Sequence, residues 1–225
     1  MPDLQITGLE VTGTDGRLLL AVPDLRIAAG TSVAILGPSG AGKSTLLHAL
    51  SGLIPVKAGR VVWGDTDIAR LTPAAAARFR AATIGLIFQD FLLFEELGSH
   101  ANAAIAAAFA PAAARVALRA RAADLLTGLG LGPATSRRVD SFSGGERQRI
   151  SVARALAPDP QVILADEPTA SLDRAAADRL IDDLAALPDT ANRTLIAVTH
   201  DTALANRLHR RLTIRDGKIT GDSDA

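Results

Sequence analysis

The residues best suited to chemistry form a glycine-rich segment between two apolar runs. In order, they are Gly37, Pro38, Ser39, Gly40, Ala41, Gly42, Lys43, Ser44 and Thr45. An apolar run over residues 33–36 precedes this segment and a helical pattern over residues 46–50 follows it, which is the strand, loop and helix order of a phosphate-binding loop. Its glycines would let backbone N–H groups approach a phosphate, and the helix N-terminus would add partial positive charge. We therefore expect it to bind nucleotide phosphates, with Lys43 at the terminal phosphates and Ser44 on Mg²⁺, although a glycine turn of similar sequence is the plain alternative.

Two carboxylates follow another apolar run. Residues 162–165 are apolar and lead directly into Asp166 and Glu167. Open α/β sheets bind ligands at the carboxyl ends of their strands, which is where these acids fall. Asp166 could hold Mg²⁺ directly or through water, and Glu167 could polarise an attacking water. An isolated Asp-Glu pair is usually a solvated turn, so this interpretation depends on the glycine-rich loop.

Two uncharged polar side chains also end apolar runs. His200 follows residues 194–199, and we expect it to sense a γ-phosphate and position the attacking water. Gln89 follows residues 84–88, and its amide could reach Mg²⁺ or that water while its backbone moves with the helical segment beyond it. The other histidines are expected to be hydrogen-bonded or exposed: His48, His100 and His209.

An α/β core must position these side chains. Near-continuous apolar runs at residues 162–165 and 195–198 indicate strands buried on both faces, and hence a parallel sheet covered by helices. Strand-like runs occur at residues 4–11, 18–27, 32–36, 61–63, 84–88, 162–165, 194–199 and 211–214. We expect a P-loop NTPase core with a mostly parallel sheet, in a single domain over residues 1–225.

Three parts of the chain depart from that core. Residues 1–30 are typical of antiparallel hairpin strands, with turn residues at 13–16. Residues from about 90 to 150 predict an inserted helical subdomain, broken at Pro111 and at residues 128–133. The tail from Gly217 to the end is expected to be frayed and polar.

Composition narrows the function classes. The chain has 225 residues, with 24 Lys and Arg against 24 Asp and Glu, so it lacks the positive charge of a general nucleic-acid binder, and no nucleic acid is expected as partner. Without cysteine it has no disulfide or thiolate metal site, which fits a reducing cytosol. Its N-terminus lacks the pattern of a secretory signal, and the uncharged residues 97–114 are mostly alanine, typical of a packed helix rather than a membrane span.

A second glycine-containing motif completes the set. It reads Ser143-Gly144-Gly145-Glu146-Arg147-Gln148-Arg149. Together with the glycine-rich loop, Gln89, Asp166-Glu167, residues 171–173 and His200, it makes the chain resemble the ATP-binding subunit of an ABC transporter over essentially its whole length. The resemblance implies that Ser143, Gly144, Gly145 and Glu146 are the signature motif, which contacts the γ-phosphate held by another subunit. A serine hydroxyl, two glycine amides and a helix N-terminus suit an anion, while a capping box is the plain alternative; both can hold.

Further expectations come from this resemblance. It implies an ATPase that binds ATP and Mg²⁺ and forms a homodimer with two composite sites, so that one chain alone hydrolyses poorly. The implied catalytic residues are Glu167, His200, Lys43 and Gln89, and the implied metal ligands are Ser44, Gln89 and Asp166. Ser171, Leu172 and Asp173 would carry information between the two sites, with a helix N-cap as the alternative for Ser171 and Asp173. The implied partner is a separate integral membrane permease, with this subunit peripheral on the cytoplasmic face of the membrane.

The segment after Gln89 bears on the branch of the family. Together with the signature it is most similar to the branch that serves lipoprotein release, macrolide-type efflux and a related cell-division complex. Glu95 and Glu96 stand where a proline-containing stretch is expected. The hydrophobic candidates for permease docking, each with core packing as the alternative, are Phe91, Leu92 and Phe94.

One departure concerns the nucleotide base. The family usually stacks adenine on an aromatic residue upstream of the phosphate loop, and this position falls at about Thr14. The chain has no tyrosine. We therefore expect adenine to rest on aliphatic side chains such as Val22, or selectivity for ATP over GTP to be loose; losing the stack would cost about 1 kcal/mol.

Alternatives from other function classes remain. The same cassette occurs in chromosome and DNA-repair proteins, which carry long coiled coils between loop and signature, but the 100 positions from Lys43 to Ser143 contain no sustained heptads. Ribosome-bound versions usually hold two cassettes in one chain. A non-catalytic nucleotide-binding module is disfavoured because Lys43, Asp166, Glu167 and His200 are all present.

Overall fold

A ten-stranded sheet runs through the protein, with the order β5-β4-β1-β2-β10-β9-β3-β8-β7-β6. The computed structural model describes residues 1–132, 137–188 and 193–224. The strands are β1 (Leu4–Thr12), β2 (Leu18–Ile27), β3 (Ser32–Leu36), β4 (Ala58–Trp63), β5 (Thr66–Asp67), β6 (Ile84–Ile87), β7 (Val162–Asp166), β8 (Thr194–Val198), β9 (Arg210–Arg215) and β10 (Lys218–Asp224). The helices are α1 (Lys43–Leu50), α2 (Pro73–Thr83), α3 (Ser99–Ala103), α4 (Ala112–Gly128), α5 (Gly144–Leu156), α6 (Arg174–Ala185) and α8 (Thr202–Arg207).

The centre of the sheet is parallel. Strand β3 pairs in parallel with β8 and β9, and β8 continues through β7 to β6 in the same direction. Every residue of β7 and β8 is buried, as the continuous apolar runs predict. The expected α/β core with a mostly parallel central sheet is confirmed, and the ends of β3, β6, β7 and β8 fall at one edge.

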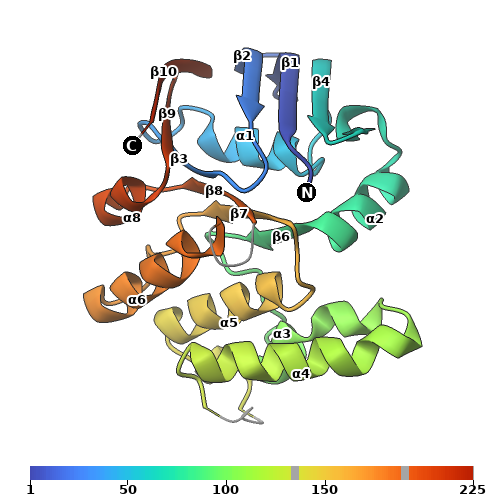
Figure 1. The fold of residues 1–225 in the computed structure, drawn as a ribbon, viewed down its shortest axis with the longest axis vertical. Helices are drawn as coiled ribbons and strands as arrows, with labels where there is room; N and C mark the ends of the chain where they lie inside the picture. The colour runs from blue at the N-terminus through green and yellow to red at the C-terminus, as the bar shows by residue number, and fades with distance from the viewer. Residues whose placement is uncertain (133–136, 189–192, 225) are drawn as a thin grey trace.

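The N-terminal strands are antiparallel. Strand β1 pairs antiparallel with both β2 and β4, and together they form the upper part of the molecule in Figure 1. Leu4, Ile6 and Leu9 of β1 are fully or almost fully buried and belong to the same core cluster as Leu46 and Leu50 of α1. This cluster holds α1, the helix that follows the glycine-rich loop, against the sheet.

The C-terminal tail is ordered, so the expectation of a frayed end was wrong. Strand β10 pairs antiparallel with β9 and makes one parallel bridge to β2, between Lys218 and Ala21. Asp216 and Gly217 turn the chain with φ values of 48° and 73°, which is the left-handed geometry of a tight hairpin turn. Backbone pairing on both sides of β10 outweighs the fraying expected of a terminal segment; Ala225 lies outside the described residues.

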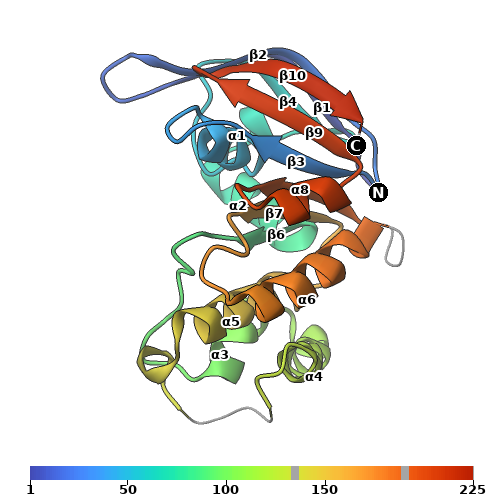
Figure 2. The ribbon, with the colours of Figure 1, turned by 90° about the vertical axis from the view of Figure 1, so that its left-hand side faces the viewer.

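The elements described between β6 and β7 are helical. Helices α3, α4 and α5 make the lower part of the molecule in both ribbon views (Figure 1 and Figure 2) and share a small core of their own. Leu126 of α4 and Ile150 of α5 are fully buried in this core, and Phe142 lies just before α5. Residues 133–136, within the expected helical subdomain, lie outside the described part. The separate core makes these helices a second packing unit beside the sheet.

Local signals set several helix starts. Thr72 Oγ1 accepts a hydrogen bond from the Ala75 amide at 3.3 Å, with Pro73 in the first turn of α2. Asp173 caps α6 by accepting from the Ala176 amide at 2.9 Å. Within residues 1–132, 137–188 and 193–224, no helix has both the length and the apolar composition that crossing a bilayer would require.

Candidate functional site

A cleft of about 540 Å³ lies at the carboxyl ends of the parallel strands. It gathers ten of the residues singled out in the sequence, from four separate segments. They are Ser39, Gly40, Gly42, Lys43, Ser44, Thr45, Gln89, Asp166, Glu167 and His200. It is also lined by residues that sequence reasoning missed: Leu19, Thr169, Ala170, Val198 and Asp201. Three of these missed residues follow the same strand ends as the predicted ones: Thr169 and Ala170 come after β7, and Asp201 comes after β8.

The glycine-rich loop connects β3 to α1 and folds around one ammonium group. Lys43 is buried, and its Nζ donates hydrogen bonds to the carbonyls of Gly37 and Pro38, both at 2.9 Å. A Cβ at Gly37 would lie 2.0 Å from the Ile214 carbonyl oxygen, so no side chain fits there. At Gly40 nothing lies within 4 Å of that position. The loop is therefore packed where it meets β9 and open where it faces the cleft.

The β9–β10 turn supports the loop from outside. The Gly217 amide donates to the Ala41 carbonyl at 2.9 Å, and the Ala21 amide donates to the Gly217 carbonyl at 2.7 Å. A Cβ at Gly217 would lie 2.5 Å from the Leu19 carbonyl oxygen. Two segments from opposite ends of the chain thus hold Ala41 and its neighbours in place.

The two carboxylates lie at the floor of the cleft. Asp166 is the last residue of β7, and its Oδ1 is buried without a hydrogen-bond partner in the part of the chain that the structure describes. Glu167 adopts a left-handed conformation with φ 47°, and its amide donates to the Val198 carbonyl at 2.9 Å. Non-glycine residues with positive φ are uncommon, and such strain gathers at functional sites. The turn directs the Glu167 side chain toward β8 and His200.

His200 and Glu167 face each other across neighbouring strand ends. The His200 amide donates to Glu167 Oε2 at 3.1 Å, and His200 Nε2 lies 3.3 Å from Glu167 Oε1. Oε1 nevertheless accepts no hydrogen bond from the described residues. Burial raises the pKa of Glu167, while the His200 amide and imidazole and the Lys43 ammonium oppose that rise and Asp166 adds to it. A carboxyl with a raised pKa and a free oxygen in a cleft is suited to accept a proton.

Gln89 reaches the cleft from a constrained loop. It is exposed and lies two residues beyond the end of β6. The next turn, at Phe91 and Leu92, has φ values of 58° and 50°. Arg154 of α5 holds this turn by donating from Nη2 to the Phe91 carbonyl at 2.7 Å and from Nη1 to the Leu92 carbonyl. The loop therefore has its shape set by the helix that begins at the signature.

Beyond that turn, hydrophobic side chains are exposed. Leu92 and Phe94 are more than half exposed, whereas Phe91 is half-buried. Leu92 and Phe94 are therefore not core residues, whereas Phe91 packs partly against the protein. Glu95 and Glu96 are exposed beside them.

The signature residues lie outside the cleft lining of their own chain. Ser143 Oγ accepts from the Glu146 amide at 3.2 Å, and Glu146 Oε2 accepts from the Ser143 amide at 2.7 Å, which is a complete capping box. The bond from the Ser143 backbone lowers the pKa of Glu146. Ser143 and Gly144 are exposed, and a Cβ at Gly145 would lie 3.4 Å from both Leu172 Cδ2 and the Ser171 carbonyl oxygen. The capping alternative is confirmed, and the start of α5 packs on the segment 171–173.

The residues expected to hold Mg²⁺ fit that ion. Mg²⁺ takes oxygen ligands, is usually held through one or two carboxylates, and completes its shell with phosphates and water. Ser44, Gln89 and Asp166 supply a hydroxyl, an amide and a carboxylate to one cleft, and the unpartnered Asp166 Oδ1 is an acceptor with unmet bonding capacity. Among the described residues there is no cluster of three or more His, Cys, Asp or Glu that would hold a metal by itself. Such a set requires the phosphates of a nucleotide to complete it.

The expected base contact is corrected by the structure. Val22 is fully buried in the core and cannot touch a ligand, whereas Leu19 is 38% exposed and lines the cleft. Both belong to β2, where alternate residues point to opposite faces. Thr14 lies in the turn between β1 and β2 and does not line the cleft. The aliphatic residue beside the phosphate loop is therefore Leu19.

The remaining histidines have structural roles. His209 Nδ1 accepts from the Ser32 amide at 3.3 Å, and His100 Nε2 lies 3.1 Å from the Arg119 carbonyl oxygen. The His48 ring lies 6.4 Å from the Phe88 ring between centroids. The expectation of a hydrogen-bonded or exposed ring is confirmed for His209 and His100, whereas His48 is half-buried beside the Phe88 ring.

Comparison with known proteins gives consistent matches. Residues 20–170 match the family described as ABC transporter. The chain is 42% identical to the lipoprotein-releasing system ATP-binding protein LolD of Syntrophus aciditrophicus over 196 residues, which cover 87% of each chain. It is also 42% identical to the macrolide export ATP-binding/permease protein MacB 1/2 of Paracoccus denitrificans over 222 residues, which cover 97% of this chain and 33% of the relative. The chain thus spans about a third of the length of that relative.

Solved structures agree with these matches. The dimeric structure of MJ0796, a bacterial ABC transporter cassette, superimposes with a TM-score of 0.91 at 29% identity, covering 98% of both chains. A dimeric post-hydrolysis state of the same cassette, bound to ADP and Pi, gives a TM-score of 0.88.

Proposed function

The chain belongs to the ABC transporter family, and on that basis we propose that two copies of this ATPase close around two MgATP and drive a separate membrane permease. One observation carries the proposal: the glycine-rich loop, the Asp166-Glu167 pair and His200 line a single cleft. These groups come from distant parts of the chain and together supply what phosphoryl transfer to water requires.

Each residue has a role that its surroundings support. Lys43, already buried in the loop, is a fixed positive charge for the terminal phosphates. Glu167 takes a proton from the attacking water, for which its raised pKa and free Oε1 are suited. His200, in contact with Glu167, holds the water and the γ-phosphate in register with that carboxylate.

Mg²⁺ is part of this proposal. Ser44, Gln89 and Asp166 would hold it, and it would neutralise charge on the phosphates. Because Gln89 is on the loop fixed by Arg154, its distance from the other two ligands depends on how the helical elements sit against the sheet.

The dimer is needed to complete each site. The start of α5 presents exposed Ser143 and Gly144 away from the chain's own cleft, and the N-terminus of this thirteen-residue helix suits a phosphate. We propose that this signature binds the γ-phosphate held by the second copy. Two related cassette structures are described as dimeric.

The proposed permease is of the lipoprotein-releasing or macrolide-export type, following the relatives named above. It would dock on the exposed Leu92 and Phe94, which lie between Gln89 and the helical elements. The subunit would then be peripheral on the cytoplasmic face of the membrane.

The test uses the Glu167→Gln variant, in which the base is lost and the shape kept. We expect turnover to fall at least about a hundredfold, within the range of general-base catalysis, and MgATP to shift the variant from monomer to dimer in light scattering. Glu10→Gln, a change in a partly exposed glutamate of β1 that pairs with Lys57 outside the cleft, is the matched control and should behave as the parent. Unimpaired turnover of Glu167→Gln would place the base elsewhere.

The partner is sought with the same variant. Tagged Glu167→Gln is incubated with detergent-solubilised native membranes in MgATP, and bound chains are identified by mass spectrometry. A permease with few spanning helices and a large extracytoplasmic domain supports the branch proposed here. A permease with many helices keeps transport and removes the branch, and ribosomal or DNA-bound partners alone contradict transport.

A further inference from the structure

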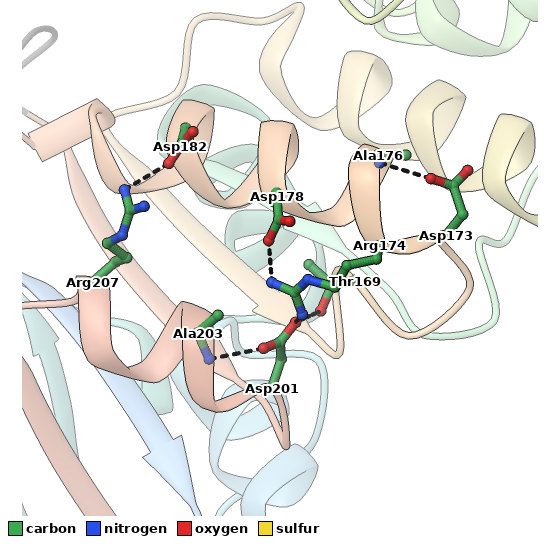
Figure 3. A network of polar contacts seen from close by, with 9 residues as sticks. All are labelled: Thr169, Asp173, Arg174, Ala176, Asp178, Asp182, Asp201, Ala203 and Arg207. Carbon is green, nitrogen blue, oxygen red and sulfur yellow. Dashed lines mark hydrogen bonds and ion pairs between the residues drawn. The ribbon is translucent and has the colours of Figure 1, made fainter.

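Arg174 joins two segments that the proposed mechanism treats separately. It directly follows Asp173 and is the first residue of α6. Its Nη1 donates to Asp201 Oδ2 at 3.3 Å, and its Nη2 pairs with Asp178 one turn along the same helix (Figure 3). The guanidinium thus bridges a carboxylate of α6 and a carboxylate that follows His200.

Asp201 is the point at which several contacts meet. Its Oδ1 accepts from the Ala203 amide at 2.8 Å and so caps α8, while its Oδ2 takes both Arg174 and the Thr169 hydroxyl, the latter at 3.4 Å (Figure 3). Its own amide donates to Thr199 Oγ1 at 2.9 Å. Since Asp201 is adjacent to His200 in the chain, whatever fixes the Asp201 backbone also fixes the base of the His200 side chain.

The other end of the bridge is the segment 171–173. Ser171 and Leu172 lie against the glycines of the signature, and Asp173 is fixed as the N-cap of α6. A change in this segment therefore moves the first turn of α6, which carries Arg174. Arg174 is linked to His200 through the Asp201 side chain and the peptide bond between His200 and Asp201.

We propose that Arg174 is a positioning residue for hydrolysis, which couples the placement of the segment 171–173 to that of His200 beside Glu167. This inference rests on the proposed function and adds a residue to it. Arg174 does not itself line the cleft, but it contacts Asp201, which does, so it acts through Asp201. Asp178 contributes by holding the guanidinium in place at i+4.

The plain alternative is that Arg174 only ties α6 to α8. The structure contains a matched pair for that role, Arg207 of α8 with Asp182 of α6 at 2.6 Å (Figure 3). Arg174 and Arg207 are equally exposed, at 58% and 60% of the side chain, and exposed ion pairs add little to stability. The Arg207 pair joins the same two helices but lies outside the cleft and does not touch Asp201.

The experiment compares Arg174→Gln, Arg174→Lys and Arg207→Gln in the full chain. The readouts are kcat, KM for ATP and the melting temperature. We expect Arg174→Gln to lower kcat about fivefold, the scale of losing one partly exposed charge-assisted hydrogen bond, with KM and melting temperature unchanged. Arg174→Lys should recover part of the rate, because one ammonium can replace one of the two contacts. Arg207→Gln should match the parent in every readout.

Two results would overturn the inference while leaving the proposed function intact. One is a kcat of Arg174→Gln equal to that of the parent. The other is a loss of kcat in Arg207→Gln as large as that in Arg174→Gln, which would mean that both arginines only connect α6 to α8. Absence of ATP turnover in the parent chain would instead contradict the proposed function, and the inference with it.

Discussion

Replacing Gly217 by alanine tests how far the nucleotide cleft depends on the C-terminal hairpin. Gly217 has a φ of 73°, and an added Cβ would lie 2.5 Å from the Leu19 carbonyl oxygen, a backbone atom that cannot move aside alone. The left-handed conformation costs a non-glycine residue about 1–2 kcal/mol. Relieving the clash would also lengthen the bonds to Ala41 and Ala21, worth about 1 kcal/mol each.

The expected loss for Gly217→Ala is therefore about 3–4 kcal/mol, or roughly 10 °C in melting temperature for a chain of this length. Gly130→Ala is the matched control, because Gly130 has the same φ of 73° but nothing within 4 Å of its would-be Cβ. It should lose only the conformational part, about 1–2 kcal/mol.

Two quantities are measured for each variant: the melting temperature by thermal unfolding, and the affinity of the folded protein for a fluorescent ATP analogue by titration. Only Gly217→Ala should weaken nucleotide binding, since Ala41 is in the phosphate loop and Gly130 follows α4. Equal losses of stability in the two variants, or unchanged nucleotide affinity in Gly217→Ala, would refute the claim that this turn braces the loop.

Three further predictions concern the cleft and its surroundings. Burial raises the pKa of Glu167, so the ionised carboxylate destabilises the fold above that raised pKa and has no such effect below about pH 4. Glu167→Gln should therefore raise the melting temperature at neutral pH and leave it unchanged near pH 4. Turnover of the parent should fall as the pH drops through the raised pKa. Leu19→Tyr should tighten ATP binding severalfold, by about 1 kcal/mol of ring stacking, whereas Thr14→Tyr should not, as measured by calorimetry. Arg154→Gln should free the turn at Leu92, which hydrogen exchange of residues 90–94 would report as faster exchange without loss of the fold.

The sequence predicts the arrangement of the site wherever a functional residue directly follows an apolar run. Asp166, Glu167 and His200 each come at the end of an apolar run, and parallel strands end at one edge of a sheet. Their meeting with Lys43 in one cleft is therefore predictable from run lengths and order alone. The Ser143 capping box is likewise a local signal that the structure reproduces.

Other features depend on contacts that no local pattern encodes. The sequence predicts Val22 as the aliphatic contact, whereas Leu19 is the exposed residue of β2 that lines the cleft. Side chains alternate between the two faces of a strand, so an error of one residue in register exchanges buried and exposed positions. Arg154 grips a turn that lies 63 residues earlier in the chain, and nothing around either segment signals the contact. The apolar pattern does not predict β10, because this strand mixes polar residues with Ile219 and lacks a continuous apolar run. The Asp216-Gly217 pair is nevertheless a strong signal for the hairpin turn before it.

The order of strands in the sheet has a consequence for synthesis of the protein. Strand β3, which leads into the phosphate loop, is made among the first 40 residues, but its neighbours on both sides are β8 and β9 from the last 35. During translation β3 must remain without either partner until β8 and β9, over residues 194–215, have left the ribosome. Unpaired apolar strands are prone to aggregate. The nascent cassette is therefore expected to need chaperone protection until β9 is made, and chains that stop before β8 should neither bind ATP nor persist in the cell.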